Sequence, residues 1–476
     1  MHHPRRRFLK QVAAASGAVT MPWMLSSNVF GQNGVTNGNS GGAPGGTASR
    51  SQAKDLTQLN WHQWRGPLAT GVAPQASPAV EWGESKNIRW KTPLPGKGHS
   101  SPIVWGDMVY VMSAEPIGAP VEPVYDNAPG THDNVGVSQR HRFVVIAVRR
   151  TDGRILWRTT LKEEFPHEGG HMMGSLVSNS PTTDGELIFA FFGSRGLYCL
   201  DVAGGVKWQK DLGRMQTLHA HGEGSSPVLY KDFLIVNWDH EGDSFLYAFD
   251  KHTGKEIWKV ARDEKTSWST PIIVETEGKS PQVVVSASKR VRGYDVHTGA
   301  LIWECAGLSG NVVSSPVAGN GMVFAGNSYD GQNMVAIRLD GAKGDITGTS
   351  NVAWKLNRST PYVPSPLLYG DTLYFLRHYQ NVLSALDARS GKPRVDAIRL
   401  ANLRDIFASP VAAANRIYVT SREGATVVLR HGPDPKILAV NQLDDSFSAS
   451  AALVERDLYF RGERFLYCIS ENRTGE

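Results

Sequence analysis

The sequence has few cysteines and lacks the cysteine patterns that carry chemistry. Its 476 residues contain 3 cysteines, which lie far apart at Cys199, Cys305 and Cys468. There is no Cys-x-x-Cys-His string for attaching haem, and the spacing fits neither a zinc site nor a disulfide framework. A bridge between two of them stays open, but the odd count leaves at least one thiol unpaired within a monomer. We therefore expect these cysteines to be small buried side chains.

The chain also lacks a block of Lys and Arg that could bind a polyanion. Its formal net charge is +5, but four of the basic residues lie between Arg5 and Lys10, so the rest of the chain is close to neutral. A neutral chain has no electrostatic footprint for nucleic acid or an anionic membrane. A Gly-x-Ser-x-Gly nucleophile elbow is absent as well. The Gly-rich run 222–226 is not placed between a strand and a helix, as a phosphate-binding loop would be.

The N-terminus is predicted to be an export signal. The string at positions 5–10, RRRFLK, resembles a twin-arginine signal, with Pro4 in place of the usual Ser or Thr. The apolar stretch that follows is too short to span a membrane. We expect a signal peptide over 1–31 and a flexible Gly/Asn/Ser-rich linker over 32–58. There is no lipobox cysteine, so we expect a periplasmic or secreted protein without a lipid anchor or transmembrane segment.

Internal repeats decide the predicted fold. A unit that begins with Ser-Pro recurs about every 45 residues, and its clearest copy runs from Ser226 to Trp258. It holds four short apolar or alternating runs, each bounded by turn residues, which is typical of strands. The units start at Pro102, Pro181, Pro227, Pro271, Pro316, Pro366 and Pro410, and an eighth copy around Ser448 lacks the proline. We predict an all-β, eight-bladed β-propeller of four-stranded antiparallel blades over 59–472.

Tryptophans mark the outer strands of the blades. They are Trp90, Trp157, Trp208, Trp258, Trp303 and Trp354, with Val395 at the corresponding place in the sixth copy. The last copy stops one strand short, and a spare strand with the closing pattern lies before the first copy at 88–92. We therefore expect the N-terminal strand to close the ring, which removes exposed sheet edges. The segment Glu115 to His141 is predicted to be a long surface loop in the first blade.

One repeat carries a family resemblance. The run Ala248, Asp250, Thr253-Gly254 and Trp258 resembles the tryptophan-docking motif of propellers of the pyrroloquinoline-quinone (PQQ) family. A second copy, from Gly293 to Trp303, departs from the motif only at its first residue. The resemblance covers about positions 60 to 470 and implies the fold more specifically than the function, because the family includes both enzymes and scaffolds. The strings WHQWRGP at 61–67 and GHSSP at 98–102 look like those of exported bacterial PQQ-binding-like β-propeller repeat proteins, and the blade count and motif resemble those of the propeller lipoprotein of the β-barrel assembly machine.

The resemblance implies that residues just before each innermost strand approach the central channel. Here this gives the candidate ligand-binding residues His99, His171, His219, His221, Glu223, Trp268 and Asn311, together with Tyr362 and Phe407. In an extended segment, His219 and His221 would point to the same side. Two interpretations stay open: a metal or polar-ligand site, because imidazole and carboxylate suit transition metals, or side chains that only bind channel water.

Quinoprotein dehydrogenases of this family generally hold PQQ against a ring of adjacent cysteines, and no two cysteines are adjacent here. No catalytic residue can be assigned, and we expect neither a cofactor nor a metal. We therefore predict a monomeric, non-catalytic binding or scaffold module for a protein or small ligand at the channel mouth, with periplasmic or envelope proteins as partners. The alternative is a periplasmic oxidoreductase that uses PQQ or a transition metal at the histidine-bearing mouth.

Overall fold

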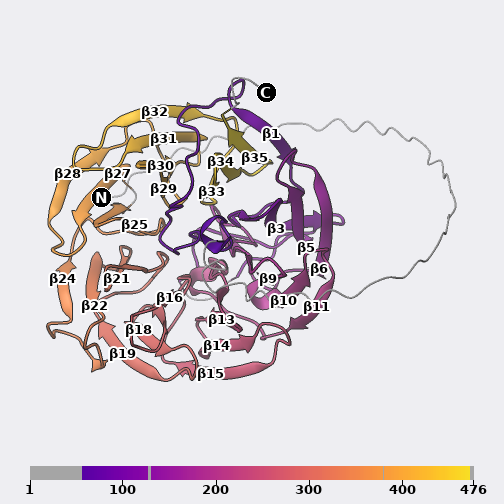
Figure 1. The fold of residues 1–476 in the computed structure, drawn as a ribbon. Coiled ribbons are helices and arrows are strands. Elements are labelled where there is room, and N and C mark those ends of the chain that lie inside the picture. Colours follow the sequence, from indigo (N-terminus) through magenta and orange to yellow (C-terminus); the bar gives the residue numbers. More distant parts are fainter. Residues whose placement is uncertain (1–55, 127–129, 379, 472–476) are drawn as a thin grey trace, which may run out of the picture. The chain divides into compact units, whose positions relative to one another are not determined.

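The computed structural model describes residues 56–126, 130–378 and 380–471. All described residues belong to one compact unit, Ser49–Glu476. In this unit eight antiparallel sheets are arranged around a central axis (Figure 1), which confirms the predicted eight-bladed propeller. The predicted signal peptide 1–31 and all but the last residues of the predicted linker lie outside the described residues.

The blades are numbered in chain order of their innermost strands, and each is given from the inside outward. Blades 1 and 2 are β2(Ile103–Trp105), β3(Met108–Ile117), β5(Arg140–Arg149), β6(Ile155–Glu164); and β8(Thr182–Thr183), β9(Leu187–Phe191), β10(Leu197–Asp201), β11(Val206–Lys210). Blades 3 and 4 are β12(Val228–Tyr230), β13(Phe233–Trp238), β14(Ser244–Asp250), β15(Glu256–Arg262); and β16(Ile272–Val274), β17(Gln282–Ser286), β18(Arg290–Asp295), β19(Leu301–Ala306), extended by β23(Gly344–Asp345).

The second half of the ring repeats the pattern. Blades 5 and 6 are β20(Val317–Gly319), β21(Met322–Asn327), β22(Asn333–Arg338), β24(Val352–Leu356); and β25(Leu367–Tyr369), β26(Thr372–Leu376), β27(Val382–Asp387), β28(Pro393–Arg399). Blades 7 and 8 are β29(Val411–Ala413), β30(Arg416–Thr420), β31(Ala425–Arg430), β32(Ile437–Gln442); and β33(Ala452–Val454), β34(Asp457–Arg461), β35(Phe465–Ser470), β1(Ile88–Pro93). The remaining elements are the short pair β4(Asn134–Val135) and β7(Gly170–His171), and two 3-10 turns, η1(Gly193–Arg195) and η2(Leu218–Ala220).

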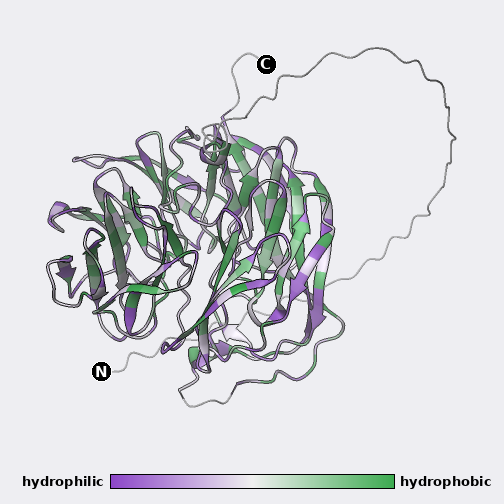
Figure 2. Ribbon diagram, turned by 60° about the horizontal axis from the view of Figure 1, so that its bottom comes forward, coloured by the Kyte–Doolittle hydropathy of each residue, from purple (hydrophilic) through white to green (hydrophobic). Residues whose placement is uncertain are grey.

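Burial explains which runs form which strands. The middle strands pack against neighbouring blades on both faces, so a strand such as β10 is apolar and buried along almost its whole length. The outermost strands have one face toward solvent, and β6 alternates between half-buried and exposed residues. Figure 2 shows this pattern as hydrophobic strands inside each blade and mixed colouring at the periphery.

The ring closes as the sequence predicted. Strand β1 lies antiparallel to β35 and supplies the outer strand of blade 8, with Trp90 opposite Cys468 and Thr92 opposite Leu466. The first described strand and the last are therefore neighbours in one sheet. Without β1, the edge of β35 in blade 8 would be unpaired. Because β1 covers it, that edge is no template for pairing with another chain.

Five of the six outer-strand tryptophans join one blade to the next. Each indole N–H donates to a backbone carbonyl of the following blade over 2.8–3.0 Å. A glycine of that blade lies under each ring, so closely that an added Cβ would come within 2.6–2.8 Å of an indole carbon. The five pairs are Trp90 with Gly153, Trp157 with Gly204, Trp208 with Gly254, Trp258 with Gly299, and Trp354 with Gly391.

Trp303 of blade 4 is the exception. Strand β23, from the β22–β24 connection of blade 5, pairs parallel with β19. The Trp303 indole is fully buried and its N–H donates to the Gln282 side chain of its own blade at 2.7 Å. The ring lies over Gly293, where an added Cβ would come within 2.5 Å of the indole Cε2. The departure of the motif at Gly293 is therefore a consequence of where this tryptophan packs.

A ring of hydroxyl groups links all eight innermost strands. In each blade a backbone N–H donates to the Ser or Thr hydroxyl oxygen at the equivalent position of the next blade, over 2.8–3.0 Å. The members, in ring order, are Ser101, Ser180, Ser226, Thr270, Ser315, Ser365, Ser409 and Ser450, which donates back to Ser101. The serine that begins each repeat thus holds neighbouring blades together at the axis.

The segment 61–73 crosses the inner strands at one end of the channel, and we call it the plug. Trp61 exchanges backbone hydrogen bonds with Val104 of blade 1, and Ala73 donates to Ala412 of blade 7. The buried Arg65 side chain donates to the carbonyls of Pro366 and Pro410, at 2.7 and 2.8 Å. Those prolines directly follow ring serines, so the plug lies on the proline side of the hydroxyl ring.

Two sequence predictions need correction or comment. The loop predicted from Glu115 to His141 is shorter, because its ends continue β3 and β5 and pair with each other up to Ile117 and Arg140. Part of it is ordered into β4, which pairs with β7 of the β6–β8 connection.

The three cysteines are buried and none forms a disulfide. Among the described residues, no helix is long and apolar enough to cross a membrane.

Candidate functional site

The channel contains a cavity of about 430 Å³ between the plug and the opposite mouth. Its lining comes from all eight blades, including six hydroxyls of the ring, and from Trp64 of the plug. In blade 7 the chain passes Phe407 and Ser409, which line the cavity, before Pro410, which binds the plug. The same order in other blades places the residues ahead of each ring serine at the mouth. The volume is within the range of about 300–1,000 Å³ that is usual for small-ligand sites.

Most of the residues that the sequence singled out line this cavity. They are His99, His171, His221, Glu223 and Trp268, with Tyr362 and Phe407 from the far side of the channel. His219 and Asn311 do not line it. Asn311 is buried, and its Oδ1 has no hydrogen-bond partner among the described residues. The Trp268 indole is fixed by a hydrogen bond from its N–H to the Gly222 carbonyl at 2.6 Å.

Four histidines meet at one side of the mouth. His132, from the blade 1 insertion, lies 4.4 Å from His219 and 5.1 Å from His221 between ring centroids, and His171 lies 4.7 Å from His221. The sequence suggested an extended segment at His219 and His221. The segment instead turns through η2, with a positive φ of 60° at His219. The two rings still lie 5.2 Å apart because the turn, rather than a strand, brings them together.

The ring nitrogens of this cluster serve mainly to hold the insertion. His219 Nδ1–H donates to the Gly130 carbonyl at 2.7 Å, and His221 Nε2–H donates to the His132 carbonyl at 2.9 Å. His171 Nδ1 accepts the backbone N–H of Met173. Each of these rings keeps a second nitrogen, but no group of three or more His, Cys, Asp or Glu side chains is arranged to bind a metal within the part of the chain that the structure describes.

Burial keeps two cavity histidines neutral. It lowers the pKa of His99 to about 3, with a smaller contribution from the positive charges of Arg461 and Arg422. It lowers the pKa of His221 to about 4, partly opposed by the hydrogen bond to His132. The pKa of His171 is also lowered by burial. His99 and His221 are therefore uncharged imidazoles at neutral and mildly acidic pH.

The carboxylates near the mouth are engaged within the protein. Glu223 accepts hydrogen bonds from the Ser194 backbone and hydroxyl, and its Oε2 lies 3.0 Å from the Arg195 guanidinium. Glu168 accepts the backbone N–H and hydroxyl of Thr217, and burial raises its pKa. Each therefore already accepts hydrogen bonds from buried donors of a neighbouring blade, Glu223 from the preceding blade and Glu168 from the following one.

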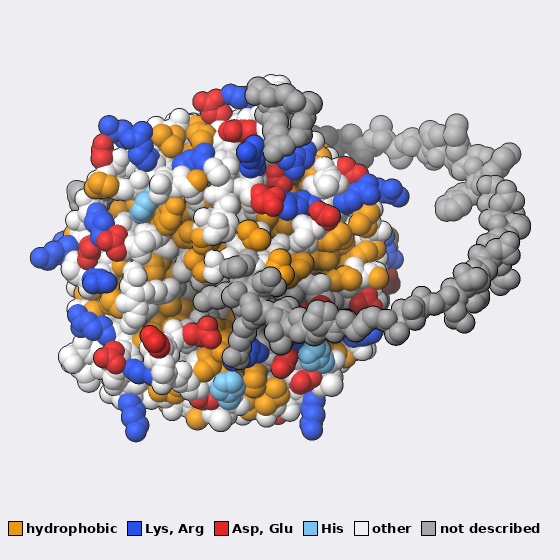
Figure 3. All heavy atoms as spheres, viewed as in Figure 1, with side chains coloured by type: hydrophobic (Ala, Val, Ile, Leu, Met, Phe, Trp, Pro, Cys, Tyr) orange, Lys and Arg blue, Asp and Glu red, His pale blue; other side chains and the backbone are white. Residues whose placement is uncertain are grey.

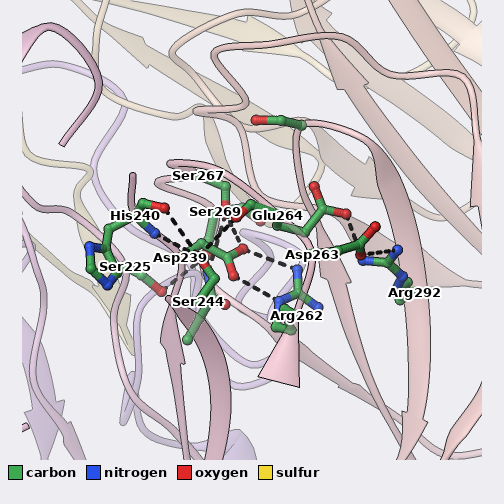
Figure 4. Close-up of polar contacts among 12 residues, drawn as sticks. Ser225, Asp239, His240, Ser244, Arg262, Asp263, Glu264, Ser267, Ser269 and Arg292 are labelled. Atoms are coloured by element: carbon green, nitrogen blue, oxygen red, sulfur yellow. Dashed lines mark hydrogen bonds and ion pairs between the residues drawn. The ribbon is translucent and has the colours of Figure 1, made fainter. Parts of the chain in front are cut away.

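Asp239 belongs to a buried polar network between blades 3 and 4 (Figure 4) and does not line the central cavity. Its two oxygens accept the Nε–H and Nη2–H of Arg262 at 2.7 and 3.0 Å, and both side chains are fully buried. Ser267 also donates to Asp239 at 2.7 Å. Next to this pair, Arg292 bonds Glu264 at 2.7 Å. The bidentate pair lies within blade 3 and leaves no free acid, and Arg262 extends the network to blade 4 by donating to the Tyr294 hydroxyl at 2.7 Å.

Sequence reasoning missed three of the lining residues that matter most: Trp64, His132 and Asp133. Trp64 lies before the first repeat, and the other two lie in the insertion, so the repeat pattern could not place them. Among the described residues of the face in Figure 3, Lys and Arg side chains alternate with Asp and Glu, without an extended area of one sign. This agrees with the neutral charge of the chain outside its N-terminus.

Comparisons with known proteins agree on the fold. The family model described as outer membrane protein assembly factor BamB matches residues 141–306 and 242–461. The structure of BamB from Moraxella catarrhalis is similar with a TM-score of 0.51 at 14% identity, over 77% of this chain and 99% of that one. Quinohemoprotein alcohol dehydrogenase from Comamonas testosteroni is similar with a TM-score of 0.56 at 10% identity, over 90% and 85%. No curated protein sequence matches the chain.

The cavity does not fit PQQ, the cofactor for which this family of propellers is named. PQQ carries several carboxylates, and a site for it needs cations to neutralise them. The cavity lining contains no Lys or Arg, and it contains the carboxylates Asp133 and Glu223. Arg422 lies against the Phe407 ring, 5.3 Å from its centroid, but outside the lining. The donor set is therefore wrong for a polyanionic quinone.

Proposed function

This chain belongs to the PQQ-like β-propeller family, and from that premise we propose that it is an exported, non-catalytic binding module. The site is the central cavity, and the ligand enters from the histidine-bearing mouth. The observation that carries the proposal is the cavity itself: about 430 Å³, lined from all eight blades and closed at the other end by the plug. A pocket of this kind, with aromatic walls and a few convergent polar groups, is typical of ligand binding.

The chemistry of the lining supports binding rather than catalysis. The ring serines use their hydroxyl oxygens to accept backbone N–H groups, and none of them is hydrogen-bonded to a histidine ring among the described residues. Glu223 and Glu168 accept hydrogen bonds from backbone N–H groups within the protein. A nucleophile needs an adjacent base, and a general acid or base needs a free titratable group. The His99 ring in the lining forms no hydrogen bond to another described residue, but burial lowers its pKa to about 3, so it is a weak base, and the lining supplies mainly aromatic surface and hydrogen bonds.

Location and partners extend this proposal. The RRRFLK string near the N-terminus supports export by a twin-arginine route, and a folded, closed ring is a suitable cargo for it. The description of the matching family model, an outer membrane protein assembly factor, supports a place in the bacterial envelope. We propose a periplasmic or secreted monomer whose partners are other envelope components.

The test is a purification of the mature protein from the periplasm. We expect an absorption spectrum with only the tryptophan and tyrosine bands and less than stoichiometric metal by mass spectrometry. The protein should also bind a small ligand. We expect Tyr329→Ala to lower the affinity for it and Tyr125→Ala to leave the affinity unchanged. These tyrosines are similarly exposed, at 40% and 54%, but only Tyr329 lines the cavity. A stoichiometric quinone or transition metal would overturn the proposal in favour of an oxidoreductase.

A further inference from the structure

We propose that the ligand of the central cavity is a neutral saccharide. The inference rests on the binding role proposed above and names the class of ligand. It is carried by three properties of the lining: the lack of buried unpaired charge, the combination of unused donors and acceptors, and aromatic surfaces arranged around the cavity.

The lining offers little to a charged ligand. It contains no Lys or Arg, and Arg422 and Arg461, whose charges act on His99, lie outside the lining, so the lining gives an anion no direct ion pair. Of its two carboxylates, Glu223 is neutralised by Arg195 at 3.0 Å, and Asp133 is an exposed residue of the rim. His99 and His221 stay uncharged, with pKa values of about 3 and 4. Burying a charge without a partner costs more than a small ligand recovers from packing, so a neutral ligand is favoured.

The polar groups that remain suit hydroxyl groups. Six members of the hydroxyl ring line the cavity: Ser101, Ser226, Thr270, Ser365, Ser409 and Ser450. Each oxygen accepts a backbone N–H of the adjacent blade, so its own hydrogen is left to donate into the cavity. The His99 ring lines the cavity without a hydrogen bond to another described residue. A sugar hydroxyl both donates and accepts, and it can therefore use both kinds of group.

Aromatic rings provide the remaining walls. Trp64 lies at the plug end, and Trp268 and Phe407 come from blades 4 and 7, three blades apart in the ring. Tyr329 stacks on Tyr362 with centroids 5.6 Å apart and an angle of 24°. The C–H faces of a pyranose ring are apolar and pack on such surfaces, while its hydroxyls remain at the edge for hydrogen bonds. The hydrogen bond that fixes Trp268 prepares one such surface before a ligand arrives.

The test compares saccharides that differ in charge on one scaffold. We would titrate the mature protein with neutral disaccharides of glucose, galactose, mannose and N-acetylglucosamine, and follow binding by calorimetry and saturation-transfer NMR. N,N′-diacetylchitobiose is paired with its deacetylated, cationic form, and digalacturonate is the anionic probe. We expect at least one neutral disaccharide to bind, and its affinity to exceed that of the charged analogues at least tenfold.

The variants place the site. We expect Trp268→Leu and Tyr329→Ala to weaken the neutral saccharide at least tenfold, and Tyr125→Ala to leave it unchanged. Binding that these variants do not alter would overturn the inference, and so would a panel in which no neutral saccharide binds. If a charged saccharide binds better and remains sensitive to Trp268→Leu, the inference of a neutral ligand fails while the binding function stands. Failure of the binding function itself is seen separately, as a stoichiometric quinone or metal in the purified protein.

Discussion

Gly293 shows how a single atom decides the packing of a blade. Its place in the docking motif is held by Ala248 in blade 3, where the following tryptophan turns outward to the next blade. In blade 4 the indole of Trp303 turns inward instead and occupies the space where a Cβ would be. The two conditions, a glycine in β18 and a tryptophan over its own sheet, therefore depend on each other.

We expect Gly293→Ala to lower the free energy of unfolding by about 1–3 kcal/mol, the usual cost of overpacking a core. The added Cβ would meet the indole of Trp303, which is fully buried and cannot swing away. Urea denaturation measures the change. Gly83→Ala is the matched control, because its nearest contact would be a carbonyl oxygen at 4.0 Å, and we expect it to be neutral. Equal stabilities for the two variants would contradict the packing argument.

The neutral histidines make stability depend on pH. The pKa of His99 is about 3 in the folded protein, below its value of 6.5 in an unfolded chain. Between these two values the unfolded state binds a proton that the folded state does not. Stability is therefore lost as the pH falls below about 6.5, and at pH 5 this one histidine costs at most about 2 kcal/mol. His62 and His221, with pKa values of about 4, act in the same direction.

We therefore predict that His99→Gln reduces the loss of stability between pH 7 and pH 5. Glutamine does not titrate, so the unfolded variant gains no proton at this position. Urea midpoints of the native protein and the variant at both pH values provide the measurement. The comparison is between two slopes, so a general loss of stability in the variant does not affect it. A variant that loses as much stability as the native protein would show that His99 is not the titrating group.

At the scale of elements, the hydroxyl ring joins strands that are far apart in sequence. Ser226→Ala removes the acceptor for the buried N–H of Ser180 in the preceding blade. An unpaired buried N–H costs about 1–3 kcal/mol. We expect this loss in urea denaturation, together with faster hydrogen exchange in the segment around Ser180. Ser226→Thr is the control, because Thr270 already fills the equivalent place in blade 4. Unchanged exchange in the alanine variant would contradict the prediction.

The strands could be predicted because each repeat states the same pattern in local sequence. Alternation, turn residues and the docking motif recur, and a partner blade lies one repeat away. The functional residues obey no such period. His132 reaches the mouth from an insertion that occurs in one blade, and His219 approaches His221 through a left-handed turn that a strand pattern cannot show. The use of the ring serines as links between blades depends on partners more than 40 residues away.

At the scale of the whole molecule, the ring is closed by a strand that is adjacent in space but distant in sequence. In blades 1 to 7 the outer strand follows the third strand in sequence, whereas in blade 8 it comes from the N-terminal side as β1. Ile88 lies opposite Ile469, and the Ser470 N–H donates to the Asn87 carbonyl at 2.9 Å. The end of β35 and the start of β1 are therefore as close as the two ends of a hairpin.

This geometry predicts the behaviour of two rearranged chains. A chain that begins at Leu94 lacks β1, so it exposes the edge of β35 and removes Trp90 from between blades 8 and 1. We expect it to associate and to unfold without a single cooperative transition.

If residues 87–93 are placed after Ser470 through an Asn-Gly turn, β1 returns to its position as the second arm of a hairpin. We expect this second chain to be monomeric by light scattering and to unfold cooperatively in urea. Both chains lack the plug, so a difference between them reports on closure alone, and identical behaviour would show that the ring does not depend on β1.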